Sequence, residues 1–92
     1  MAYYVYIIQS QVDDSYYKGY SEHPLLRLIQ HNNKECNYTS HKTPWNLVYV
    51  EEMESKTAAL AREKNLKKAT IDRIKALLSH PKNIVHRFIE DR

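Results

Sequence analysis

Arg27 and His31 form the pair in this 92-residue chain whose types and spacing best suit a reaction at phosphate. They stand one turn apart in a segment with helical periodicity, so their side chains can reach one ligand. An arginine offers a planar fork of donors to phosphate oxygens, and a histidine gains or loses a proton near neutral pH. The pair is therefore a candidate for phosphoryl chemistry, although two polar residues on a helix surface usually have no such role.

Glu63 is a second candidate, because helical spacing places it beside an apolar stripe that contains Ala59, Leu60 and Leu66. A carboxylate close to a core needs a partner. Lys67 at i+4, or Arg27, can supply one as a salt bridge. The alternative is a metal ion, since one carboxylate can hold Mg²⁺ that keeps several waters and shares its other positions with phosphate oxygens.

Tyr6 and Tyr17 stand out among the eight tyrosines because of their neighbour Gly19. Most tyrosines in strands simply pack and let the hydroxyl reach water. Gly19 is the only glycine of the chain and lies within a strand pattern, two residues after Tyr17. A glycine weakens strand pairing unless a bend, a bulge or a close approach requires it, so a specific reason is expected here.

The elements that must position these residues follow from periodicity. Three runs rich in aromatic and β-branched residues predict strands over residues 3–9, 16–20 and 45–51, and Asp13-Asp14-Ser15 predicts the turn of a hairpin between the first two. Pro24 marks the start of a helix that ends near residue 32 or 33, with Leu25, Leu28 and Ile29 as its apolar face. The polar residues 33–44 predict a surface loop.

Two more helices are predicted after the third strand. Ser55 caps the first, over residues 56–68, and Thr70 caps the second, whose buried face contains Ile71, Ile74, Leu77 and Leu78. The element order predicts one α/β (α+β) domain over residues 1–80, with a small sheet flanked by helices. Residues 81–92 form a tail that adds a short helix or simply docks.

Composition narrows the classes of protein. The hydrophobic fraction of 42% and the charged fraction of 27% are typical of a soluble globular domain. There is no apolar run long enough to span a membrane and no signal peptide, and Cys36 is a lone cysteine, so we expect a cytoplasmic protein that does not enter membranes.

The charges are unevenly distributed along the chain. Residues 1–54 carry four Lys and Arg against seven Asp and Glu, whereas residues 55–92 carry ten against four. The basic half can attract nucleic acid or merely be solvated.

The order of these motifs resembles that of the GIY-YIG nuclease superfamily. Tyr4-Val5-Tyr6 is followed, after ten residues, by Tyr17-Lys18-Gly19 and then by the segment 27–32 (RLIQHN). Pro44 and the segment 55–64 (SKTAALAREK) are similar to those of its small stand-alone bacterial members. Each motif is short, but their order and separations together are specific. Two departures are Tyr4 in place of the first glycine and Lys18 in place of an apolar residue.

The resemblance implies a central three-stranded antiparallel sheet and a set of functional residues. Tyr6, Tyr17, Arg27 and His31 match catalytic positions, and Glu63 matches the glutamate that binds the metal. The implied activity is a Mg²⁺- or Mn²⁺-dependent endonuclease that hydrolyses phosphodiester bonds in DNA and recognises DNA structure in repair or recombination. Tyr6 is the preferred general base, with His31 and Tyr17 as alternatives.

DNA, branched or nicked, is the expected partner, and a targeting protein is a second one. Four lysines are expected to contact the DNA: Lys18, Lys42, Lys64 and Lys67. The rival hypothesis is a non-catalytic nucleic-acid-binding or adaptor module, favoured by the basic second half. Binding through phosphates weakens steeply with salt and persists without metal, which separates the two hypotheses.

Overall fold

The computed structural model of the chain describes residues 2–89, so residues 90–92 of the predicted tail lie outside the described residues. The element order is the predicted one, with a single 3-10 turn, Ser40–Lys42, inside the predicted loop. The elements are β1 (Tyr3–Ser10), β2 (Tyr16–Ser21), α1 (Pro24–Asn32), β3 (Trp45–Met53), α2 (Lys56–Lys67), α3 (Ile71–Leu78) and α4 (His86–Ile89). None of the described helices is long and apolar enough to cross a membrane.

The three strands form one antiparallel sheet in the order β2-β1-β3, which confirms the predicted fold class. Tyr6 lies in the central strand, directly opposite Gly19 on one side and Val50 on the other. The register with β3 shifts between Ile7 and Ile8. Since β2 has no strand on its outer side, that edge of the sheet is open to side chains from the helices.

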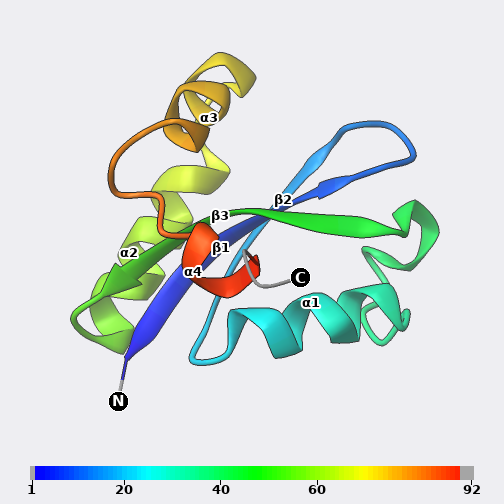
Figure 1. Cartoon of the computed structure of the whole chain (residues 1–92), viewed down its shortest axis with the longest axis horizontal. Helices are drawn as coiled ribbons and strands as arrows, with labels where there is room; N and C mark the ends of the chain where they lie inside the picture. The colour runs from blue at the N-terminus through cyan, green and yellow to red at the C-terminus, as the bar shows by residue number, and fades with distance from the viewer. Residues whose placement is uncertain (1, 90–92) are drawn as a thin grey trace.

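Both faces of the sheet are covered, by different helices (Figure 1). On the face that we call the Tyr49 face, α2 and α3 contribute Ala59, Leu66 and Ile74 to a core with Val5, Ile7 and Tyr49. The opposite face, the Tyr6 face, carries Tyr6, Ile8, Leu47 and Val50 and is covered by α1 and α4. Successive residues of a strand point to opposite faces, so this division follows directly from the alternation along β1.

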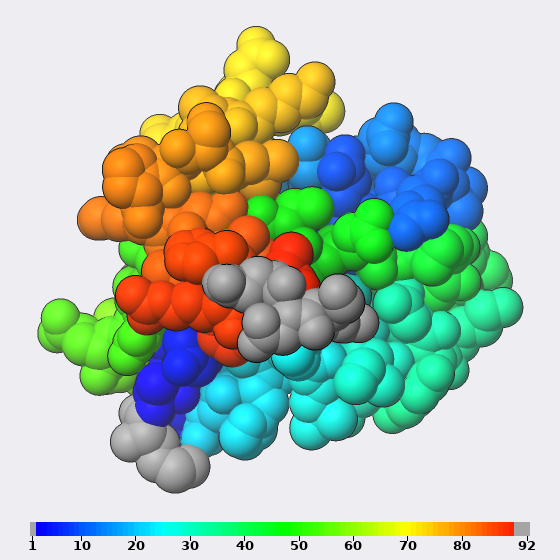
Figure 2. Space-filling model, in the orientation of Figure 1, coloured from blue at the N-terminus to red at the C-terminus, as the bar shows by residue number. Residues whose placement is uncertain are grey.

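The described part of the tail packs on the Tyr6 face. Figure 2 shows residues 84–89 (red) over the middle of the molecule, between α1 (cyan) and α3 (yellow to orange). The backbone N–H of Ile84 donates to the Val50 carbonyl over 2.8 Å, and the rings of Phe88 and Tyr4 meet edge to face at 5.4 Å. The division of the chain at residue 80 stays a prediction.

The predicted apolar faces of the helices are wrong at three residues. Ile29, Leu60 and Ile71 are 53%, 42% and 63% exposed, whereas His31, which was expected off the apolar face of α1, is fully buried. The buried residues of α1 are Pro24 and His31, which are seven positions apart and therefore lie on the same side of the helix. Hydropathy alone predicts that the leucines and isoleucines of α1 face the core. In the structure, the side of α1 that faces the sheet carries the His31 imidazole.

Gly19 permits a close approach of Tyr6, not an unusual backbone conformation, since its φ is not positive. A Cβ atom at this position would lie 2.6 Å from the Tyr6 hydroxyl oxygen and 2.7 Å from Cζ of the same ring. The Tyr6 ring is 1% exposed and packed in the core, so it cannot simply move aside. The only glycine of the chain therefore lies where the Tyr6 ring crosses the neighbouring strand.

We expect Gly19→Ala to lower the free energy of unfolding by about 1–3 kcal/mol, because the added methyl group overpacks a fixed core. Urea unfolding measures this change. In a Tyr6→Phe background the same substitution should cost less, since the nearest atom to the new Cβ is the hydroxyl oxygen. A Gly19→Ala protein as stable as the wild type would contradict the close approach.

Candidate active site

The centre of the candidate site is a buried hydrogen bond between Tyr6 and His31. The Tyr6 hydroxyl lies 3.1 Å from His31 Nε2, and both residues are almost completely buried. Tyr6 comes from the central strand β1 and His31 from the last turn of α1.

Burial raises the pKa of Tyr6 to about 12, against the opposing effect of the nearby Arg27 guanidinium. Burial also lowers the pKa of His31 to about 4, with a smaller contribution from Arg27. At neutral pH the pair is a neutral phenol next to a neutral imidazole, which is a proton acceptor.

Tyr17 lies beside this pair and is only partly buried. Its ring meets the His31 ring edge-on with centroids 4.9 Å apart, and it also contacts the exposed Tyr38 ring at 5.7 Å. Burial raises the pKa of the Tyr17 phenol, Arg27 opposes the rise and Glu63 adds to it. The charges of Arg27 and Glu63 therefore act on the Tyr17 hydroxyl with opposite sign.

Arg27 and Glu63 belong to helices that cover opposite faces of the sheet. Arg27 is half-buried on α1, where its guanidinium donates to the Gln30 side chain. Glu63 belongs to α2, which packs on the Tyr49 face, and its charge raises the pKa of Tyr17, a residue of the edge strand β2. The side chain of Glu63 is 17% exposed and pairs with Lys67 Nζ at 3.6 Å. The partner is 57% exposed, so this ion pair contributes little to stability.

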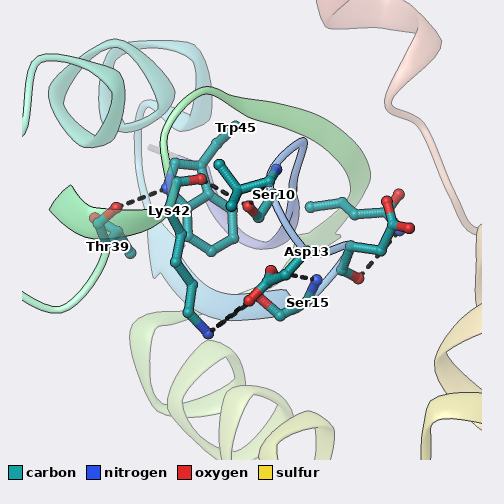
Figure 3. Close-up of polar contacts among 9 residues, drawn as sticks. Ser10, Asp13, Ser15, Thr39, Lys42 and Trp45 are labelled. Carbon is teal, nitrogen blue, oxygen red and sulfur yellow. Dashed lines mark hydrogen bonds and ion pairs between the residues drawn. The ribbon is translucent and has the colours of Figure 1, made fainter.

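The structure thus places Tyr6, Tyr17 and His31 in contact, with Arg27 next to Tyr6. Glu63 is linked to this group through the effect of its charge on Tyr17, and the catalytic roles of the five residues stay predictions. The lysines expected to contact DNA lie in different places. A hollow of about 400 Å³ next to the site is lined by Tyr16, Tyr17, Lys18, Tyr38 and Lys67. Lys64 is exposed on α2. Lys42 instead ties the loop to the hairpin, with Nζ 3.4 Å from an Asp13 carboxylate oxygen (Figure 3).

Apart from the asparagine that follows His31, nothing in the sequence indicated how the loop after α1 encloses the site. Thr39 is fully buried, and its Oγ1 lies 2.8 Å from His31 Nδ1, on the side of the imidazole that Tyr6 does not occupy. The loop ends are joined by Asn32, whose side chain accepts from the Trp45 N–H over 2.6 Å and donates to the Trp45 carbonyl. An asparagine directly after the candidate histidine was the one available signal.

The donor set fits a divalent ion only if substrate completes its coordination. Among residues 2–89 there is no group of three or more His, Cys, Asp or Glu side chains placed to hold a metal ion. Glu63 is a single carboxylate with one exposed ion-pair partner, and His31 already uses both ring nitrogens in hydrogen bonds. Mg²⁺ commonly binds through one or two carboxylates, waters and substrate phosphates, so Glu63 is compatible with such an ion.

Comparison with known proteins agrees with this fold. The family model described as the GIY-YIG catalytic domain matches residues 2–75, a range that contains all five candidate residues. The chain belongs to the GIY-YIG catalytic domain family, which is a family of nucleases. GIY-YIG nucleases generally use divalent metal ions, and the domain implies a DNA substrate.

Within this family the chain is similar to UPF0213 proteins. It is 40% identical to one from Staphylococcus saprophyticus over 65 residues, which cover 70% of this chain and 78% of that protein. Identity is also 40% to one from Haloquadratum walsbyi, over 73% of this chain and 75% of that protein. The solution NMR structure of a UPF0213 protein from Bacillus halodurans superposes with a TM-score of 0.58 at 27% identity, over 98% of this chain and 96% of the other.

The buried His31 makes stability depend on pH. Its pKa of about 4 in the folded chain lies below the ordinary value of 6.5. Between these values the unfolded chain binds more protons, so the stabilisation is complete above pH 6.5 and is lost as the pH falls toward 4. We expect His31 to account for a loss of about 2 kcal/mol in the free energy of unfolding between pH 7 and pH 5.

Urea unfolding at the two pH values, for the wild type and for His31→Gln, measures this loss. The variant is expected to be less stable at both values but to lose less between them. The four other histidines are exposed, so they contribute equally in both proteins. The same loss in both proteins would contradict the burial of an uncharged His31.

Proposed function

We propose that this protein is a metal-dependent endonuclease that hydrolyses phosphodiester bonds in DNA. The observation that carries the proposal is the buried hydrogen bond from Tyr6 to His31, at 3.1 Å, set beside the charges of Arg27 and Glu63. A neutral imidazole next to a phenol supports proton transfer between the two groups. The guanidinium supports binding of a phosphate, and the carboxylate supports binding of the cation that accompanies it.

Tyr6 is the general base of the proposed reaction. It takes a proton from the attacking water while its own hydroxyl proton passes to His31 Nε2. This coupling is needed because a phenol with a pKa of about 12 does not ionise by itself at neutral pH. The hydroxide attacks phosphorus, the bond to the 3′-oxygen breaks, and the leaving oxygen takes a proton from solvent. Tyr17 lines the neighbouring hollow and orients the water.

Arg27 and Glu63 supply the charged groups of the proposed reaction. Arg27 neutralises the negative charge that develops at the phosphorus centre. Glu63 would hold Mg²⁺ or Mn²⁺, which would supply Lewis-acid chemistry for the hydrolysis. Lys67, whose exposed ammonium pairs with Glu63, could contact a phosphate of the substrate beside the ion.

We further propose that the enzyme recognises DNA structure, in repair or recombination, not sequence. The hollow beside the site presents lysines and tyrosines, which contact phosphates and base faces, whereas sequence is read from base edges. Lys18 and Lys67 line the hollow and Lys64 is exposed on α2, so these three are the proposed DNA contacts. Contact by Lys42, the targeting partner and a cytoplasmic location remain predictions.

Replacing either charged residue should remove cleavage without unfolding the protein. We expect Glu63→Gln and Arg27→Ala each to lower kcat for a nicked, flapped or branched DNA by about 10²-fold or more, because each takes away charge stabilisation in the transition state. Cleavage is measured with Mg²⁺ or Mn²⁺, and a chelator should abolish it in the wild type. Glu52→Gln and Arg73→Ala, which change exposed residues away from the site, are the matched controls. Equal cleavage by all variants would mean a wrong site or a contaminant.

The choice of base is tested by comparing two tyrosines. Tyr6→Phe keeps the packing but removes the proton acceptor, so we expect a loss in kcat of about 10²–10⁴-fold. Tyr17→Phe should cost less, since an orienting group is easier to replace by water. A larger loss for Tyr17→Phe than for Tyr6→Phe would assign the base to Tyr17.

A non-catalytic nucleic-acid-binding module is the second candidate function. It is favoured by the excess of Lys and Arg in residues 55–92, several of which are exposed on α2 and α3. Such a module binds DNA without metal, and its affinity falls steeply with salt. Binding that Glu63→Gln leaves unchanged, without cleavage of any DNA by the wild type, would favour this function.

A further inference from the structure

Thr39 is the least expected member of the buried polar cluster. It belongs to the segment predicted only as a surface loop, yet its side chain is fully buried. Its Oγ1 lies 2.8 Å from His31 Nδ1, while the Tyr6 hydroxyl lies 3.1 Å from Nε2 of the same ring. The imidazole is therefore held between two hydroxyl groups, one from the loop and one from the sheet.

The position of Thr39 is fixed by contacts that do not involve His31. The indole N–H of Trp45 donates to the Thr39 carbonyl over 3.0 Å, and the two residues lie together at the base of the loop in Figure 3. Farther along the loop, the Ser10 hydroxyl donates to the Lys42 carbonyl over 2.7 Å. Because the backbone is anchored independently, Thr39 can impose an orientation on the histidine instead of following it.

The hydrogen bonds at the two ends of the ring favour the same tautomer. Thr39 has one hydroxyl hydrogen, which it donates to the Cys36 carbonyl over 3.3 Å, so its oxygen is left to accept from His31 Nδ1–H. Among the described residues Nε2 is the only acceptor in reach of the Tyr6 hydroxyl, since the nearby Arg27 can only donate to it. Tyr6 is thus the donor to an unprotonated Nε2.

We propose that Thr39 is a positioning residue that holds the His31 proton on Nδ1 and keeps Nε2 free to take the Tyr6 proton. This inference rests on the proposed function, in which Tyr6 loses its proton to His31. In the other tautomer Nε2 already carries a hydrogen, so it has no free lone pair with which to accept the Tyr6 proton. The role is distinct from that of the five candidate residues, since Thr39 acts only through His31.

The kinetic test compares Thr39→Val with Thr39→Ser. Valine keeps the shape but cannot accept from Nδ1–H, so we expect kcat to fall about 10- to 100-fold with little change in KM, as for other partners that orient a functional histidine. Serine keeps the hydroxyl and should retain most of the activity. Thermal unfolding of both variants identifies any general loss of structure. Equal activity of Thr39→Val and wild type would overturn the proposal.

A second measurement needs no substrate. The ring-nitrogen NMR shifts of His31 at pH 7 report which nitrogen carries the hydrogen. We expect the Nδ1–H form in the wild type and in Thr39→Ser, and a shift toward the Nε2–H form in Thr39→Val. A wild type in the Nε2–H form, or a valine variant that keeps the Nδ1–H form, would overturn the proposal. A wild type that cleaves no DNA would instead contradict the proposed function, and the two failures are therefore distinguishable.

Discussion

The hydrogen bond between Tyr6 and His31 is the interaction on which the rest of this structure depends. Two polar side chains are removed from water at the centre of a small protein, which is costly unless every polar atom has a partner. Gly19 makes room for the tyrosine, the last turn of α1 delivers the histidine, and Thr39 occupies its second nitrogen. Among the described residues no buried side-chain nitrogen or oxygen lacks a partner.

The position of β2 at the edge of the sheet exposes Tyr17 to charged residues from helices on both faces. Arg27 is carried by a helix on the Tyr6 face and Glu63 by a helix on the Tyr49 face, and both charges act on Tyr17 in the edge strand β2. A second carboxylate shows the contrast. Glu51 is 9% exposed and accepts from Tyr49 at 2.7 Å and from Arg62 at 3.0 Å, so its charge is already satisfied within the protein. Among the described residues the ion-pair partner of Glu63 is an exposed lysine, which a cation can displace.

The family relationship and the geometry support each other at different levels. The match over residues 2–75 identifies a nuclease domain, and it ends before α4 and the segment that packs on the Tyr6 face. The geometry adds the states of individual groups. A tyrosine whose pKa is raised and a histidine whose pKa is lowered form a pair in which the proton lies on the phenol at rest, and the proposed mechanism requires that it move.

Local chemistry was enough to predict the elements of this protein. The side chains of Ser55 and Thr70 cap α2 and α3 as expected, because capping depends on residues within one turn. The motif order also indicated the five candidate residues. Tertiary structure alone decided that Ile29 is exposed while His31 is buried, and that Thr39 closes on the imidazole. These outcomes depend on which side of α1 faces the sheet and on loop anchors between residues distant in sequence, and no periodicity within a single segment carries that information.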